Sequence, residues 1–468
     1  MGDSIRTEKV VLLFDTYNQD SQNLHTSFKL AGKNYLAAAI DDDGFLPDDV
    51  ISIYGYFLGK FEKSERITGK PRYFNQIQVP DFWEISASNT GGKVHDLNKE
   101  RARIFYAEPK HKRLIKVVDW YDDKGVVRSS DHYNKQGALY ARTVFNKKGQ
   151  RVNKTYFSAD GREIIMENYV TKNIILNDGD IVRIFANKLD FILFFFEKAG
   201  LQEHRVFFNT LSTSFFTSQR LKGDEKKDVL FWQEPKREDI PGNMVSILQK
   251  TANRASKIMV QNKAAYEKLL ALGAPADVVS SLGYIYPFVK ENQHRAEVLI
   301  CTNSDRIAHL EKIVKAIPEM HFTIAAITEM SSKLMSIDVY DNVSLYPGVK
   351  MGILDELFQG CDFYLDINHE SEIVSAVQKA FLHNHLIFGF RETLHNPSYI
   401  AEEHTYAMDD VDQMIYDLKG ILLDQNLIDE HIKIQHAAAM LENAQTYGEI
   451  SCKKGKCIIS PTPKTLLH

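Results

Sequence analysis

The stretch YDDKGVVRSSDHYNKQGALYARTVFNKKGQRVNKTYFSADGREIIMENYVTKN, residues 121–173, repeats one pattern five times at a spacing of 12 residues. Each copy opens with an aromatic residue, and four residues later stands glycine in four copies and asparagine in the fifth. Because only 25 of the 468 residues are glycine, four glycines in register mark a repeated structural unit. The repeat positions are Tyr121, Gly125, Tyr133, Gly137, Phe145, Gly149, Phe157, Gly161, Tyr169 and Asn173.

Each copy has the composition of a tight turn between two strands. Asp122, Asn134, Asn146 and Ser158 stand where a type I turn needs a side-chain acceptor, and glycine then takes the left-handed position. In the fifth copy we expect Asn173 in that position, because asparagine adopts left-handed backbone comparatively easily. About seven residues remain between turns, which is enough for one strand. The stretch therefore predicts an antiparallel meander.

The strands between these turns carry polar residues on both faces, so neither face has the pattern of a normal core. Residues 101–173 hold 16 Lys and Arg against 8 Asp and Glu, a local charge of +8, whereas the whole chain carries −5 and the remainder −13. A single-layer sheet exposes faces and edges that proteins cover with a partner or defend with charge. We expect a docking or polyanion-binding sheet, with a solvated sheet that binds nothing as the alternative.

Length and composition indicate a soluble globular protein of two or three domains, with 44% hydrophobic and 25% charged residues. The opening MGDSIRTEKVVLLFD lacks the extended apolar segment of a secretory signal. Phe191–Phe196 is too short to span a membrane and indicates a buried helix. Four cysteines argue against a disulfide framework and for a reducing, cytoplasmic compartment. Cys452 and Cys457 lack the two further nearby ligands that a metal site needs.

The rest of the chain alternates apolar strand-like runs with helical patterns, which predicts an α/β fold. Strands are expected at 10–15, 35–40, 50–56, 205–209, 229–232, 257–261, 298–301, 321–326, 343–345, 363–367 and 386–390. Helices are expected at 191–201, 240–254, 264–272, 306–317, 352–359 and 372–382, and through Leu418 and Ile432.

This pattern predicts two Rossmann-like domains that face a cleft, joined near residues 286–291, with the meander inserted in the first domain. We expect residues 1–64 and 176–290 to form the discontinuous first domain and 65–175 the inserted extended sheet. Residues 291–425 then form the second domain, and 426–468 a C-terminal helix and tail. Asp41, Asp42 and Asp43 are expected to form a solvated loop.

The second domain resembles the donor-binding domain of retaining GT-B glycosyltransferases. In that class an arginine and a lysine clamp the nucleotide diphosphate. Aligning VLICTNSDRIAHLEKIVKAI places Asn303 and Ala308 at these two positions. Burying a diphosphate without countercharge costs on the order of several kcal/mol. Arg306 and Lys312 lie close by in the sequence, so a shifted clamp stays open.

The other catalytic positions of the class are also altered. Its motif has two glutamates separated by seven residues, but Gln378 follows Glu370 at that distance, and Ala380 follows Glu372. Histidines of the second domain fall on different elements and predict no metal site. The resemblance implies a donor site without catalytic residues or cofactor. The strand ends of the first domain, where active relatives often place a histidine, offer Asn209, Thr210, Gln233 and Glu234.

The two domains, the insert with YDDKG, YNKQG, FNKKG and FSADG, and the opening VVLLFDTYNQDSQNLHTSFKLAGKNY resemble one family over almost the whole chain. It comprises the GtfB-type accessory subunits of the O-linked glycosyltransferase that modifies serine-rich-repeat adhesins before export by the accessory Sec route. There the active GtfA-type partner transfers N-acetylglucosamine from its UDP donor to Ser or Thr. The accessory subunit stabilises the partner and helps to hold the acceptor polypeptide.

The resemblance implies a non-catalytic cytoplasmic subunit, in a 2:2 complex with its partner, whose repeat docks the partner's sheet by edge or face. An active retaining glycosyltransferase with an atypical UDP-sugar site stays open, as does peripheral contact with the membrane. We do not expect nucleic-acid binding, because the repeat has no regular aromatic and basic face. For any single polar residue of the cleft, ordinary capping of a strand end is the favoured explanation. The expected acceptor-binding residues are Asn18, Asn209, Thr210, Gln233, Asn303, Asn368, Glu370 and Gln378.

Overall fold

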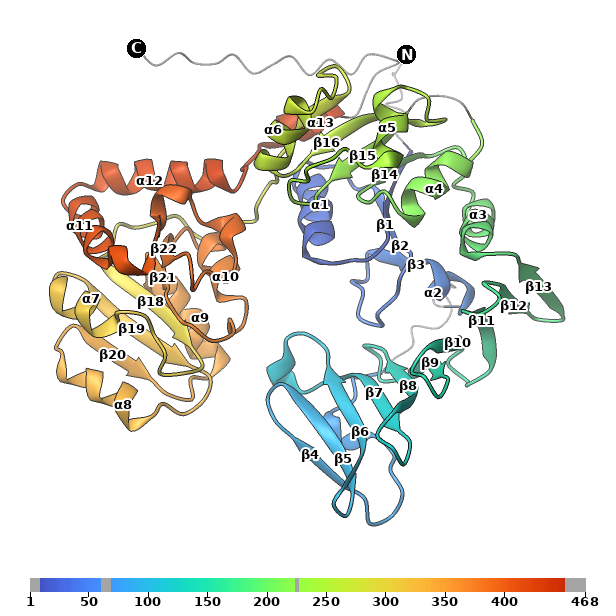
Figure 1. The fold of residues 1–468 in the computed structure, drawn as a ribbon, viewed down its shortest axis with the longest axis horizontal. Helices are drawn as coiled ribbons and strands as arrows, with labels where there is room; N and C mark the ends of the chain where they lie inside the picture. The colour runs from blue at the N-terminus through green and yellow to red at the C-terminus, as the bar shows by residue number, and fades with distance from the viewer. Residues whose placement is uncertain (1–8, 60–68, 224–226, 451–468) are drawn as a thin grey trace, which may run out of the picture. The chain divides into compact units, whose positions relative to one another are not determined.

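The computed structural model describes residues 9–59, 69–223 and 227–450, which divide into two compact units (Figure 1). Of the described residues, those within 9–25 and 33–281 belong to the first unit, and those within 26–32 and 282–450 belong to the second. The second unit therefore begins at Leu282, earlier than the predicted boundary at residue 290. Among the described residues, no helix has both the length and the apolar character needed to cross a bilayer.

The first unit contains a seven-stranded parallel sheet of order β17-β16-β15-β14-β1-β2-β3. All residues of β1 and β15 are buried, as expected for parallel strands covered on both faces. Its strands are β1 (Val10–Phe14), β2 (Leu36–Ala39), β3 (Val50–Ser52), β14 (Arg205–Phe208), β15 (Asp228–Trp232), β16 (Ala255–Val260) and β17 (Val279–Ser281). The helices are α2 (Ile53–Phe57), α3 (Lys188–Lys198), α4 (Thr213–Arg220), α5 (Gly242–Leu248) and α6 (Lys263–Ala271), while α1 (Gln19–Leu30) runs on into residues of the second unit.

The strand predicted at 50–56 is only half correct. It ends at Ser52, whose hydroxyl accepts the backbone N–H of Gly55 at 2.8 Å and so caps the start of α2. The predicted buried helix at Phe191–Phe196 is confirmed as part of α3, in which Phe191, Ile192, Phe195 and Phe196 are buried.

The insert is a ten-stranded antiparallel meander, in which each strand pairs with the next along the chain (Figure 1). The meander is confirmed, but it continues past the predicted boundary at residue 175 to Phe185. Its strands are β4 (Glu84–Ala87), β5 (Gly91–Asp96), β6 (Lys99–Tyr106), β7 (Ile115–Tyr121), β8 (Val127–Tyr133), β9 (Leu139–Phe145), β10 (Arg151–Phe157), β11 (Glu163–Asn168), β12 (Ile174–Asp178) and β13 (Ile181–Phe185).

The predicted turn chemistry is confirmed in four copies. Gly125, Gly137, Gly149 and Gly161 have φ angles of 77°, 79°, 74° and 83°. In the first turn Asp122 Oδ1 accepts the backbone N–H groups of residues 124 and 126, at 2.9 and 3.0 Å. The same pattern recurs in the next two turns, and Ser158 takes the acceptor's place in the fourth.

The prediction for the fifth copy is wrong by one residue. Lys172, with φ of 67°, takes the left-handed position in place of Asn173. The turn begins earlier, because Asn168 Oδ1 accepts the backbone N–H groups of Val170 and Thr171 at 2.9 and 3.0 Å. An asparagine acceptor at the end of β11 therefore fixes the turn more strongly than the preference of Asn173 for left-handed backbone.

The expectation of two exposed polar faces is also wrong. Ala141, Tyr156, Ile165 and Leu176 form a cross-strand row that belongs to the hydrophobic core of the first unit. Tyr156 stacks on Tyr54 with ring centroids 4.4 Å apart. The sequence pattern concealed this face because tyrosine, counted as polar, contributes a large apolar ring to a core.

The acidic loop 41–43 is solvated at Asp41 and Asp43, as predicted, but Asp42 is buried and the loop also contacts the insert. The carbonyl oxygen of Asp42 accepts the hydroxyl of Tyr140 at 2.8 Å. Asp43 pairs with Lys116 at 2.6 Å. Like-charged neighbours are stable here because the basic sheet supplies cations and donors.

The second unit contains a six-stranded parallel sheet of order β20-β19-β18-β21-β22-β23. Ile428 and Ile432 pack in its core, so the helix predicted as a separate C-terminal element belongs to this unit. Residues 451–468, with Cys452 and Cys457, lie outside the described residues. The strands are β18 (Glu297–Thr302), β19 (His321–Ala326), β20 (Val343–Tyr346), β21 (Phe363–Asp366), β22 (Leu386–Phe390) and β23 (Thr405–Tyr406). The helices are α7 (Leu310–Ala316), α8 (Ser332–Met335), α9 (Met351–Gly360), α10 (Ala376–Leu382), α11 (Val411–Leu422), α12 (Gln425–Ala438) and α13 (Ala444–Ile450).

Candidate functional site

The carboxyl edge of the first sheet holds a connected polar network. Asn209, which follows β14, donates to Ser21 Oγ at 2.9 Å and to Gln233 Oε1 at 2.8 Å. Gln233, which follows β15, donates to Gln261 Oε1 at 3.0 Å. Asn18 Oδ1 accepts the backbone N–H of Ser21 at 3.0 Å. The structure thus brings together three of the predicted residues, Asn18, Asn209 and Gln233, and links them to one another.

The fourth predicted residue of this edge, Thr210, belongs to a neighbouring contact. Its hydroxyl donates to Asp15 Oδ2 at 2.9 Å. The same carboxylate accepts the backbone N–H groups of Thr213 and Ser214, at 3.1 and 2.8 Å, where α4 begins. A helix N-terminus favours an anion, and here the chain's own Asp15 provides it.

The carboxyl edge of the second sheet holds a separate cluster. Asn368, which follows β21, accepts the Thr302 hydroxyl at 2.9 Å and donates to the carbonyl oxygen of Glu370 at 3.1 Å. Asn303 is exposed beside Thr302. Gln378 lies on α10 and donates to the Tyr399 hydroxyl at 3.1 Å, so it packs within the unit, apart from the hydrogen bonds of the Asn368 cluster.

Sequence reasoning missed the charged centre of this edge. His395 Nδ1 lies 2.5 Å from Asp366 Oδ1, and its Nε2 lies 2.6 Å from the carbonyl oxygen of Glu370. The hydrogen bond to Asp366 raises the pKa of His395 to about 9, so the imidazole is protonated at neutral pH and donates from both nitrogens. In the sequence, His395 was indicated only by its position shortly after a buried strand. Several other histidines of the same domain occupy comparable positions, so nothing distinguished it from them.

Glu372 accepts a backbone hydrogen bond at the N-terminus of α10, as Asp15 does at the N-terminus of α4. Its carboxylate accepts the backbone N–H of Val377 at 2.8 Å, and burial raises its pKa. The intervening residues Val374 and Ser375 have φ angles of 49° and 51°. Left-handed backbone is strained for a β-branched residue, so the surrounding contacts hold this loop in place.

The basic residues of the second edge are paired with carboxylates of the chain. Arg306 and Lys312, which could have formed a shifted diphosphate clamp, pair with Glu370 at 2.8 Å and Asp412 at 2.7 Å. Within residues 9–59, 69–223 and 227–450, no group of three or more His, Cys, Asp or Glu side chains could hold a metal ion.

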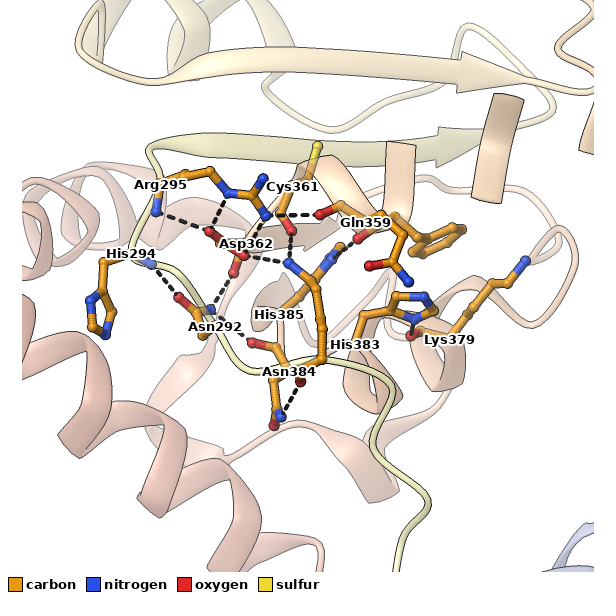
Figure 2. Close-up of polar contacts among 12 residues, drawn as sticks. Asn292, His294, Arg295, Gln359, Cys361, Asp362, Lys379, His383, Asn384 and His385 are labelled. Carbon is orange, nitrogen blue, oxygen red and sulfur yellow. Dashed lines mark hydrogen bonds and ion pairs between the residues drawn. The ribbon is translucent and has the colours of Figure 1, made fainter. Parts of the chain in front are cut away.

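The opposite edge of the second sheet carries an ion cluster around the buried Asp362 (Figure 2). Arg295 donates to both carboxylate oxygens of Asp362, at 2.8 and 3.1 Å, and Lys290 forms a further ion pair with it. Burial alone would raise the pKa of Asp362, but the hydrogen bonds from Arg295 and Lys290 outweigh burial and lower it to about 2. Asn292 donates to the carbonyl oxygens of Asp362 and Asn384, at 2.9 and 2.7 Å.

This ion cluster fastens residues 290–295 to the sheet. A cavity of about 660 Å³ lies beside it, lined in part by Arg295, Gln359 and His383. Ligands of open α/β sheets bind at the carboxyl ends of the strands, whereas Asp362 precedes β21. We therefore assign this edge a structural role.

The ten-stranded sheet exposes apolar surface away from the repeat's aromatic residues. Tyr133 is buried and the other four aromatics are half-buried. The most exposed large hydrophobic residues on its strands are Ile181, Val182 and Ile184 of the edge strand β13, at 53%, 62% and 69%. The far edge strand, β4, instead presents Glu84 and Ser86 outward. An unpaired edge with three exposed β-branched residues is a site at which another chain can bind.

The fold matches that of known glycosyltransferases. The crystal structure of the pneumococcal O-GlcNAc transferase GtfA in complex with UDP and GlcNAc aligns at a TM-score of 0.52, over 94% of this chain and 98% of that chain, with 12% identity. The chain is therefore a GT-B-fold protein with a ten-stranded insert.

Family models identify its parts as the GtfB N-terminal domain (11–57), the GtfB middle domain (83–186), the GtfB third domain (188–272) and the GftB/GlyA-F C-terminal domain (298–435). The UDP-N-acetylglucosamine–peptide N-acetylglucosaminyltransferase stabilizing protein GtfB of Streptococcus pneumoniae is 42% identical over 418 residues, covering 89% of this chain and 93% of that protein. A chain in the crystal structure of a GtfA/B complex bound to UDP and GlcNAc aligns at a TM-score of 0.89 with 41% identity, over 94% of this chain and 99% of that chain. The chain belongs to the GtfB family.

Proposed function

We propose that this chain is the non-catalytic subunit that stabilises and activates a GtfA-type glycosyltransferase. The complex adds the first N-acetylglucosamine from UDP-GlcNAc to Ser or Thr of a serine-rich-repeat adhesin. The names of the relatives and the match to a chain of a GtfA/B complex support this assignment. The buried free thiols of Cys301 and Cys361 fit action in the reducing cytoplasm.

The absence of catalysis is inferred from one observation. At the carboxyl edge of each parallel sheet, one helix start is filled by a carboxylate of the chain, Asp15 at α4 in the first unit and Glu372 at α10 in the second. A donor diphosphate would have to displace these carboxylates and would meet Asn303 and Ala308 in place of an arginine and a lysine. Such an edge is suited to neutral ligands.

We propose that the acceptor polypeptide binds at these carboxyl edges. Gln233 lies half-buried at this edge with its amide bonded to Asn209 and Gln261, and a Ser or Thr hydroxyl, which both donates and accepts, would replace one of these bonds. In the second unit the amide of Asn368, which is 2% exposed, is likewise bonded within the chain, to Thr302 and to the carbonyl oxygen of Glu370. Replacing Gln233 with alanine is expected to weaken retention of a serine-rich peptide without affecting binding of the partner, and peptide titration of the complex measures the change.

We propose that the partner docks on the ten-stranded sheet at β13, as part of a 2:2 assembly. Addition of a strand at this edge would cover Ile181, Val182 and Ile184 and pair the free backbone groups of β13. The basic character of the sheet adds long-range attraction toward an acidic partner surface.

The test is co-expression with a catalytic GtfA-type homologue and a serine-rich acceptor. Wild type is expected to co-purify with the enzyme and to raise transfer of N-acetylglucosamine. Val182→Asp combined with Ile184→Asp is expected to reduce co-purification by roughly tenfold or more. Val339→Asp, at an aliphatic residue 74% exposed in the second unit, serves as the matched control and should co-purify like wild type.

Two results separate the claims. If wild type neither co-purifies with the enzyme nor raises its activity, the stabilising role is wrong. If the double variant at β13 still co-purifies fully, the partner docks elsewhere. Calorimetry of the chain alone with UDP-GlcNAc tests the alternative of an active glycosyltransferase, and measurable binding with sugar transfer would establish it.

A further inference from the structure

The end of the insert that carries β4 combines an unpaired strand edge with a pocket (Figure 1). Among the described residues β4 pairs only with β5, so its outer side has no strand partner there. The pocket has a volume of about 460 Å³ and is lined by residues of β4, β5, β6 and the turn that joins β4 to β5. A strand edge of this kind can pair with another chain.

An aromatic ring forms the floor of this pocket. Phe105 is 44% exposed, and its cross-strand partner on β5 is Gly91. Because glycine has no side chain, the phenyl ring stays uncovered on that side. The next residue in sequence order before it, Ile104, is fully buried in the small core on the other face of the insert, so Phe105 points away from that core. The floor is therefore apolar and accessible.

The polar groups around the floor are bonded within the insert. Lys93 and Arg103 both pair with Glu100, at 2.9 and 3.0 Å, and the hydrogen bond from Lys93 contributes most to lowering the pKa of that carboxyl. With their charged ends held by Glu100, the two side chains offer methylene groups to the pocket. The hydroxyls of Ser88 and Thr90 lie 3.1 Å apart and bond to each other. The pocket is therefore suited to an apolar group.

The same edge also carries a projecting aromatic residue. Phe82 lies two residues before β4, is 97% exposed and has φ of 68°. Left-handed backbone is strained for an aromatic residue, and full exposure of the ring to water gives no stability in return. Strain of this kind is typical of residues held in place for contact with another molecule.

The edge is complementary to a second copy of itself. In an antiparallel pair of β4 strands related by a twofold axis, opposite side chains must lie on the same face, so the axis passes through Ile85 or Ser86. Centring on Ser86 keeps the two Glu84 carboxylates well apart, whereas centring on Ile85 would make them diagonal neighbours. The Ser86 register sets Phe82 opposite Thr90 of the second copy, a residue that lines the pocket.

We propose that two copies of this chain join through their β4 edges, with Phe82 of each copy in the pocket of the other. The contact leaves β13, at the far edge of the sheet, for the catalytic partner. Its place in a 2:2 complex rests on the proposed function, with one partner at each β13 and one contact between the like chains. Because β4 is short, the interface is small, and we expect a dissociation constant of about 10 µM for the chain alone.

Sedimentation velocity of the full chain without its partner tests the contact, at concentrations from about 1 to 100 µM. Wild type is expected to pass from monomer to dimer over this range, and Phe82→Asp to associate about tenfold or more weakly. Leu97→Asp is the matched control, because Leu97 is 87% exposed with φ of 54° but lies in the hairpin between β5 and β6. This control should dimerise like wild type. Both side chains are exposed, and thermal unfolding confirms that the variants fold.

Cysteine cross-linking tests the position of the axis. Ser86→Cys places two thiols opposite each other in the dimer, so a short thiol cross-linker should join the two copies. Wild type and Leu97→Cys give the background from the native cysteines and should cross-link less. Wild type that stays monomeric at about 100 µM would overturn the proposal. It would also be overturned if Phe82→Asp dimerised like wild type, or if Ser86→Cys cross-linked no more than Leu97→Cys.

The complex with the catalytic partner separates this contact from the proposed function. Light scattering of the co-purified complex should give 2:2 for wild type and 1:1 for Phe82→Asp, with co-purification retained in both. A Phe82→Asp complex that stays 2:2, or a wild-type complex that is 1:1, would contradict the β4 contact. Failure of wild type to co-purify with the enzyme would instead contradict the stabilising role and leave the dimerisation of the chain alone to decide the β4 contact.

Discussion

The parallel sheets and the ten-stranded sheet use polar residues in opposite ways. At the carboxyl ends of the parallel sheets, polar groups bond to one another, as Asn209 does to Gln233, and a carboxylate fills one helix start in each unit. The ten-stranded sheet instead keeps an exposed apolar edge at β13 and a pocket beside Phe105. Polar groups at the carboxyl edges are thus bonded within the chain, so a ligand there must exchange with these bonds, whereas the insert presents exposed surface directly.

A substitution in the interior of the first unit, beside its parallel sheet, should lower the free energy of unfolding most. Arg254 and Asp228 are both fully buried and joined by hydrogen bonds of 2.8 and 3.1 Å. Arg254→Met removes one partner and leaves the carboxylate buried without its cation, which should lower the free energy of unfolding by about 3–5 kcal/mol. Urea denaturation measures the loss.

The exposed pair Lys250–Asp277 provides the control for this experiment, because its side chains are 58% and 65% exposed. Lys250→Met should change the free energy of unfolding by less than about 1 kcal/mol. Similar losses of unfolding free energy in the two variants would mean that the buried Arg254 contributes no more to stability than a surface ion pair does.

Two glycines of the repeat test whether its turns are equivalent. Gly149 has φ of 74° and no neighbour within 4 Å of an added Cβ, so Gly149→Ala should cost about 1–2 kcal/mol from backbone strain alone. Gly137 has the same backbone but touches Lys70, so Gly137→Ala should cost about 3 kcal/mol or more. Thermal unfolding ranks the two variants, and equal losses would contradict the close approach at Gly137.

The local features of the fold were predictable from the sequence, because they depend on residues close in the chain. The turn acceptor Asp122 and its glycine Gly125 are three residues apart, and the buried strands are continuous apolar runs. The prediction for the fifth turn failed because Asn168, which lies outside the aligned repeat, accepts the hydrogen bonds that set the turn.

The sites were harder to predict because their members are distant in the sequence. Asn209 meets Ser21, and His395 meets Asp366, only after the strands have been ordered in the sheets. Gln378 was expected at a binding edge, but it faces Tyr399 inside its unit. Residue type and spacing identify a candidate, whereas the direction of its side chain depends on tertiary packing.

The His395–Asp366 bond predicts a pH dependence at the carboxyl edge of the second sheet. The hydrogen bond to Asp366 raises the pKa of folded His395 to about 9, from about 6.5 in the unfolded chain. Its stabilisation is therefore complete below about pH 6.5 and is lost as the pH rises through about 9. The difference in unfolding free energy between wild type and His395→Asn should shrink between pH 7 and pH 9.5. A difference that does not vary with pH would show that the imidazole is neutral in the folded chain.

Substitution of Asp15 should lower the free energy of unfolding least, because its contacts lie at the end of one short helix. Asp15→Ala removes the acceptor for Thr210 and for two backbone N–H groups of α4, which should cost about 1–2 kcal/mol of unfolding free energy. Asp15→Asn keeps one oxygen acceptor and loses the charge that favours the helix start, so its cost should be the lesser of the two. Thermal unfolding of the two variants separates the hydrogen bonds from the charge. If Asp15→Ala were as stable as wild type, water would replace the carboxylate without loss of unfolding free energy. This edge of the first sheet would then be accessible to solvent, like the exposed surface of the ten-stranded sheet.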